Sequence, residues 1–168
     1  HHSTIALGYV IEKITDKLSE LTSKLQIEWN SIKMDQMFWK CAVSDALVQL
    51  VARKQEIDIK ILEKILEDFP FRPEFGFCEE IALHLMEAFQ MNSEFCRPLE
   101  LQYVKALSDF FMYEKSDFMA FRVGYNTQME MKDEIRRIVK GTPNVEKEMR
   151  NYYAKNKMRL NSFLSFLQ

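Results

Sequence analysis

Apolar residues recur at the spacing of an α-helix along most of the chain. Near the N-terminal end the intervals alternate between four and three residues, which is the pattern of a heptad seam. The seam predicts a helix that begins after Ser3 or Thr4 and ends near Trp29 or Ile32; its apolar positions are Leu7, Ile11, Ile14, Leu18, Leu21 and Leu25. We expect this helix to pack within the same chain, as most such short seams do. The alternative is a homo-oligomer that pairs through residues 5–30.

The next segment is apolar on almost every side. Residues 35–53 begin at Asp35, a good helix N-cap, and their polar positions reduce to a thin stripe of Gln36, Lys40, Ser44 and Gln49. A helix that is apolar nearly all round has to be surrounded by other elements. We therefore predict that residues 35–53 form the central helix of the fold.

The same periodicity continues to the C-terminal end and is interrupted by a few helix-stop signals. Pro70 and Pro73 prevent the third helix from continuing, and the segment KGTPN at 140–144 combines a lysine in the last turn, a glycine cap and a proline. The helices that we predict after residue 53 cover 57–68, 77–90, a segment starting at Pro98, a segment from Ser116 or Asp117 to Val139, and 144–167.

These segments predict an all-α protein of about seven helices with long N- and C-terminal helices. The arrangement is either an irregular bundle or a short superhelix of antiparallel helix pairs. The chain has 168 residues with four Gly and four Pro, a composition that favours helix over sheet. We interpret residues 1–3 as a tag or linker remnant and expect residues 4–168 to form a single domain, because no low-complexity linker divides them.

The cysteines and the hydropathy pattern bear on the compartment. Three Cys, at positions 41, 78 and 96, are an odd number and argue against a disulfide framework. No apolar run approaches the roughly 18 residues of a membrane span. We therefore expect an intracellular protein, cytoplasmic or nuclear, that does not insert into a membrane.

The segment DFPFRPEFGF, residues 68–77, concentrates four Phe and two Pro in ten positions. Prolines hold the backbone outside helical geometry, so a loop positions these side chains. We predict that Phe71 and Phe75, with Arg72 between them, contact a partner protein. The alternative is that both rings fill the gap where the chain turns, since buried aromatic rings outnumber exposed anchors. We add Trp29 and Tyr153 to the candidate partner contacts.

Charge is unevenly distributed. Residues 132–168 hold nine Lys or Arg and four Asp or Glu, whereas the whole chain has a net charge of −2. Cations that contact nucleic-acid phosphates would come from this segment: Arg136, Arg137, Lys140, Lys147, Arg150, Lys155 and Lys157. The alternative is a solvated set of helix faces that pair with acidic residues of the same chain.

Candidates for chemistry are few. Cys78, Glu80, His84 and Cys96 are the types that bind metals, but the tight Cys or His pairs of structural zinc sites do not occur. Glu79 and Glu80 would lie at a helix N-terminus, where acidic side chains suit the helix dipole. We predict no cofactor, no metal and no catalytic residues.

The combined expectation is a non-enzymatic protein–protein interaction domain, an adaptor or a subunit of a larger complex. It would bind a partner helix or peptide through an apolar and aromatic groove, to which the ten Met would lend plasticity. The alternatives are a nucleic-acid-binding helical module that uses residues 132–159 and a helical domain that binds a regulatory small molecule.

Overall fold

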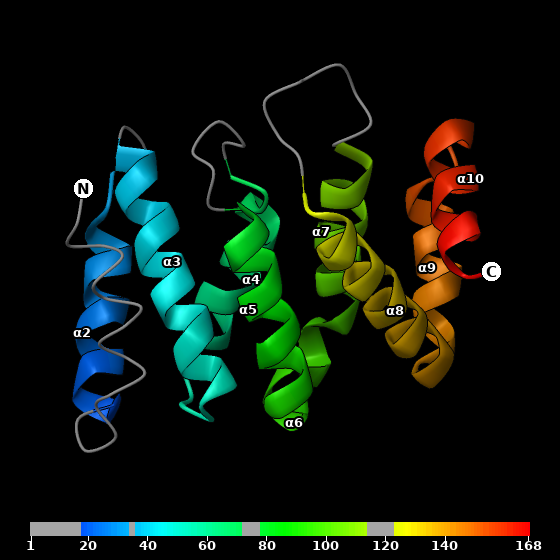
Figure 1. Ribbon diagram of the computed structural model, residues 1–168. Coiled ribbons are helices and arrows are strands. Elements are labelled where there is room, and N and C mark those ends of the chain that lie inside the picture. The colour runs from blue at the N-terminus through cyan, green and yellow to red at the C-terminus, as the bar shows by residue number, and fades with distance from the viewer. Residues whose placement is uncertain (1–17, 34–35, 72–77, 114–122) are drawn as a thin grey trace. The chain divides into compact units, whose positions relative to one another are not determined.

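The computed structural model describes residues 18–33, 36–71, 78–113 and 123–168. Over these residues the chain is helical and contains no strand, which confirms the predicted all-α class (Figure 1). The first helix lies in the described region only from Leu18 onward, so the predicted seam positions Leu7, Ile11 and Ile14 lie outside it. The elements are α2 Leu18–Ser31, α3 Met37–Ala52, α4 Ile59–Asp68, α5 Cys78–Met91, α6 Ser93–Cys96, η3 Arg97–Leu99, α7 Glu100–Tyr113, α8 Tyr125–Gly141, α9 Pro143–Tyr152 and α10 Lys157–Phe166.

The chain divides into two compact units, residues 1–97 and 98–168. We describe each unit separately. The single domain expected over residues 4–168 stays a prediction.

In the first unit α3 packs against both α2 and α5 (Figure 1). Leu47, Val48, Leu50 and Val51 of α3 are fully buried. Three polar positions of this helix, Lys40, Ser44 and Gln49, are buried as well, and Asp45 is partly exposed. Polar groups in a surrounded helix need hydrogen-bond or charged partners. Lys40 and Ser44 find theirs on neighbouring helices, whereas Gln49 donates to Asp45 of α3 itself.

The boundaries of α4 follow from its sequence. The Asp58 carboxylate accepts a hydrogen bond from the backbone N–H of Lys60 at 2.9 Å, which caps the first turn. Phe69 leaves helical geometry with φ −70° and ψ 136°, as expected for a residue that precedes a proline. The helix buries Ile61, Leu62, Ile65 and Leu66 on one face.

In the second unit α7 contacts α8, α9 and α10, and α8 also contacts α9 and α10. Pro143 begins α9 at its first turn, where the missing N–H of proline costs nothing. Gly124 precedes α8 as its N-cap. The part of the predicted sixth helix that covers residues 116–122 lies outside the described residues.

The predicted continuous helix over 144–167 is instead two helices, α9 and α10, which is a correction to the sequence interpretation. Residues 153–155 form a turn, and the Asn156 side chain accepts a hydrogen bond from the backbone N–H of Arg159 at 3.1 Å. This bond caps α10 as a new helix. No glycine or proline marks the break, and apolar residues recur at helical spacing on both sides of it. The sequence pattern therefore did not indicate the break.

No helix in the described part of the chain has both the length and the apolar character needed to cross a membrane.

Candidate functional site

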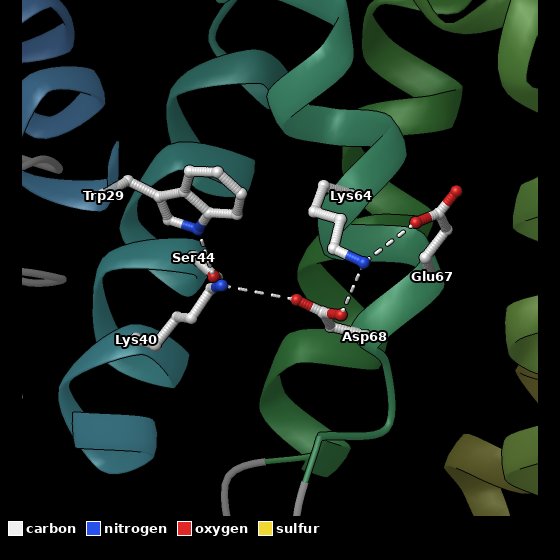
Figure 2. Close-up of polar contacts among 6 residues, drawn as sticks. All are labelled: Trp29, Lys40, Ser44, Lys64, Glu67 and Asp68. Carbon is white, nitrogen blue, oxygen red and sulfur yellow. Dashed lines mark hydrogen bonds and ion pairs between the residues drawn. The ribbon is translucent and has the colours of Figure 1, made fainter. Parts of the chain in front are cut away.

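A polar network joins three helices of the first unit around Lys40 (Figure 2). Lys40 on α3 has a side chain only 9% exposed, and its Nζ lies 3.5 Å from Oδ2 of Asp68 on α4. The same Nζ lies 4.6 Å from the ring centroid of Trp29 on α2. Trp29 Nε1 in turn donates a hydrogen bond to Ser44 Oγ at 3.0 Å. A buried ammonium group needs such compensation, so the network serves to join α2, α3 and α4.

Asp68 has a second cation beside it. Lys64 Nζ lies 3.1 Å from Asp68 Oδ1 and 3.0 Å from Glu67 Oε2, and both contacts stay within α4 (Figure 2). Lys64 is half exposed, and exposed pairs of this kind contribute little to stability. The contact from Lys40 is therefore the one that connects Asp68 to a neighbouring helix.

An Asp–His pair connects α3 to α5. His84 Nδ1 lies 2.6 Å from Asp45 Oδ1, and Gln49 Nε2 donates to Asp45 Oδ2 at 2.9 Å. Burial alone would lower the pKa of His84. The hydrogen bond and charge of Asp45 and the charge of Glu87 outweigh that effect and the opposing charge of Arg53, so the pKa is raised above 6.5. The cationic form of His84 is the form that the fold favours.

This pair predicts a pH-dependent contribution to stability. Because the pKa of His84 is higher in the folded chain than in the unfolded chain, the contribution is fully present below pH 6.5 and is lost as pH rises through the folded-state pKa. We expect wild type to exceed His84→Gln in free energy of unfolding by the largest margin below pH 6.5, and by a shrinking margin at higher pH. Urea unfolding of both proteins across this range measures the margin.

One experimental result would contradict this interpretation of His84. The only other histidines are His1 and His2, so a pH-dependent margin between the two proteins reports on His84 itself. A margin that stays constant or grows as pH rises would show that Asp45 does not stabilise the cation.

In the second unit a single carboxylate accepts hydrogen bonds from three side chains. Asp109 on α7 accepts from the hydroxyls of Tyr152 at 2.8 Å and Tyr153 at 2.7 Å, and from Arg159 Nη1 at 3.1 Å. Burial, together with the Asp109 carboxylate, raises the pKa of Tyr152 to about 12. The same two causes raise the pKa of Tyr153. Both phenols therefore stay protonated as donors, and the cluster fastens the α9–α10 turn to α7.

A buried carboxylate lies on α8. Glu134 is 3% exposed in its side chain and accepts from Arg137 Nε and Nη2, both at 2.8 Å. Tyr103 of α7 donates its hydroxyl to the same carboxylate at 3.3 Å. The hydrogen bond to Glu134 raises the pKa of Arg137. This carboxylate, like Asp109, is occupied in joining two helices.

Phe71 follows α4 with an unusual backbone. Its φ of 53° is in the left-handed region, which a bulky side chain rarely adopts. The backbone N–H of Phe71 donates to the carbonyl of Asp68 at 2.6 Å, and its ring meets that of Phe69 edge to face at 6.2 Å between centroids. Phe69 is buried, whereas Phe71 stays partly exposed.

The other predicted partner contacts are placed differently. Trp29 and Tyr153 are buried, with 8% and 2% of their surfaces exposed, and both use their polar atoms inside the fold. Phe75 and Arg72 lie outside the described residues. The roles of these four residues in partner binding stay predictions.

The predicted nucleic-acid contacts fall into two groups. Arg136, Arg137 and Arg150 each pair with a carboxylate on their own helix, namely Asp133, Glu134 and Glu146. The lysines at 140, 147, 155 and 157 are exposed, and none forms an ion pair with the described part of the chain. Nucleic-acid binding stays a prediction that would depend on these four lysines.

The cysteines do not assemble with other metal-binding types. All three are buried thiols that form no disulfide; Cys78 Sγ donates to the Pro70 carbonyl at 2.9 Å and Cys96 Sγ to the Ala88 carbonyl at 3.7 Å. Burial raises the pKa of Cys96 to about 12, which keeps it a thiol. Within the described ranges, no three His, Cys, Asp or Glu side chains come close enough together to hold a metal.

The sequence interpretation missed the polar contacts between helices. Asp45 and His84 are 39 residues apart, and Asp109 is 50 residues from Arg159. No local motif connects such positions. The one available signal was the polar stripe of residues 35–53, since a polar residue in a surrounded helix requires a partner.

Comparison with protein-family models, curated proteins and solved structures finds no match for this chain.

Proposed function

We propose that the chain is a protein–protein interaction domain, an adaptor or a subunit of a larger complex, and that it acts without catalysis. The observation that carries the proposal is Phe71. A bulky residue in the left-handed region costs roughly 1–2 kcal/mol, and such backbone outliers concentrate at functional sites. Here the outlier holds an aromatic ring partly exposed where α4 ends.

The polar clusters support the same role indirectly. Lys40, His84 and the carboxylates of Asp109 and Glu134 each hold one helix against another. Those contacts give these groups a structural purpose. Exposed and partly exposed side chains, such as Phe71, are then the groups that would recognise a partner protein.

We place the protein inside the cell as part of this proposal. All three cysteines are buried thiols that form no disulfide, which supports this placement because a reducing compartment preserves thiols.

The test compares partners captured from cell extract by the intact chain and by the variant Phe71→Ala/Phe75→Ala. We expect the variant to lose one specific partner while its melting temperature changes little, because Phe71 is not part of the fully buried core. Tyr125→Ala, which removes an aromatic ring 74% exposed on α8, is the control and should retain the partner.

Two results would contradict the proposal. One is equal capture of every partner by the variant and the intact chain. The other is turnover of a substrate by the purified chain at a rate that falls when one of its side chains is replaced.

A further inference from the structure

The outward face of α5 carries a mixed acidic and apolar stripe. We define the α5 stripe as Glu80, Leu83, Glu87, Gln90 and Met91, all of which are exposed. Leu83 and Met91 expose 36% and 56% of their surfaces. The opposite face of the helix is buried and includes Ile81, Leu85 and Phe89. The stripe is therefore an exposed helix face of mixed acidic and apolar composition.

We propose that the α5 stripe binds an amphipathic helix of a partner protein that carries Lys or Arg one heptad apart. This inference rests on the proposed interaction role, and it adds a second surface and the chemistry of the partner that would cover it.

The spacing of the stripe favours a helix as the occupant. Positions 80, 83, 87 and 90 are separated by three, four and three residues, so they follow one face of α5, with Leu83 as the apolar position among three polar ones. At 1.5 Å per residue, Glu80 and Glu87 are about 10.5 Å apart along the axis. A partner helix that runs alongside α5 would repeat its contacts at the same interval.

The charge of the stripe favours a basic occupant. Residues 78–96 contain four Glu and neither Lys nor Arg. Neither Glu80 nor Glu87 forms an ion pair with any of the residues that the structure describes, although the charge of Glu87 contributes to the raised pKa of His84. Lysine or arginine at matching positions would complement these carboxylates and select the partner, while like charges would exclude others.

The exposed apolar side chains of the α5 stripe supply apolar surface that a partner helix could bury. Leu83 lies between Glu80 and Glu87, and Met91 lies one turn beyond Glu87. A thioether side chain adapts to irregular partner surfaces. Anionic lipid headgroups and nucleic-acid phosphates would be repelled by the two carboxylates, so a cationic protein segment is the macromolecule that fits.

The test is a selection of helical peptides of about 20 residues, some 30 Å of helix, from a displayed random library on the full chain. We expect the enriched peptides to carry Lys or Arg seven residues apart with apolar residues between them. Their binding should fall about tenfold or more in Glu80→Lys/Glu87→Lys, and it should weaken as salt is raised. Glu148→Lys on α9, the same substitution at one exposed position outside the stripe, should bind as wild type does.

A charge exchange completes the experiment. A selected peptide whose two cations are replaced by Glu should fail on wild type and recover binding on Glu80→Lys/Glu87→Lys. The proposal is overturned if no such peptides are enriched, if the stripe variants bind them as well as wild type does, or if the exchanged peptide does not recover. A partner lost in Phe71→Ala/Phe75→Ala would leave the proposed function standing in each of those cases.

Discussion

Asp109→Ala is expected to lower the free energy of unfolding of residues 98–168 by about 2–4 kcal/mol, because one carboxylate serves three donors. Tyr153 is the donor that suffers most: its side chain is buried and its hydroxyl would lose an acceptor at 2.7 Å. Tyr152 and Arg159 are more exposed and can turn to water instead. Urea unfolding followed by far-ultraviolet circular dichroism measures the change.

Two companion variants separate the cluster from ordinary surface charge. Asp133→Ala removes an exposed carboxylate with a single partner on its own helix, Arg136, and should change stability by less than about 0.5 kcal/mol. In Tyr153→Phe the critical donor is already gone, so adding Asp109→Ala should cost less than it does in wild type. Equal costs in both backgrounds would show that the Tyr153–Asp109 bond contributes nothing.

Leu47→Ala is expected to destabilise the first unit by about 2–5 kcal/mol, because truncating a buried leucine loses transfer energy and leaves a cavity. Leu47 is fully buried in α3, the helix that packs against both α2 and α5. Leu47→Met, which nearly conserves volume, should cost less than about 1.5 kcal/mol. Met91→Ala on the exposed face of α5 should change stability by less than about 0.5 kcal/mol. A loss for Leu47→Ala no larger than that for Met91→Ala would contradict the central placement of α3.

Fluorescence assigns these effects to the units. Both tryptophans, Trp29 and Trp39, lie in the first unit. If the units unfold independently, Leu47→Ala shifts the fluorescence transition, and Asp109→Ala shifts the circular dichroism transition alone. A shift of the fluorescence transition in Asp109→Ala would instead support the single domain predicted from the sequence, because both tryptophans lie outside residues 98–168.

The helices were predictable wherever periodicity and stop signals agree. The apolar run of α3 indicated a surrounded helix, and Pro70 and the segment at 140–144 marked real boundaries. The break between α9 and α10 was not predictable in this way. It depends on Asn156 as a cap and on Tyr153 reaching Asp109, a residue 44 positions earlier.

The candidate site was predicted less well than the fold, for a physical reason. Aromatic residues are favoured both in cores and at interfaces, so composition alone does not separate Trp29, which is buried, from Phe71, which is partly exposed. The α5 stripe went unnoticed because its acidic residues also suit the outer face of any solvated helix. Its exposed Leu83 and Met91 become visible only once the buried face of α5 is known.

Site-specific photo-crosslinking in cells tests most directly the central claim that this chain recognises proteins through exposed side chains while its polar clusters join helices. A photoreactive amino acid would replace Phe71 in one protein, Leu83 in a second and the exposed Glu148 as a control. We predict a discrete crosslinked protein from position 71 or 83 that is absent from position 148. The same products from all three positions, or no product from 71 and 83, would contradict the claim.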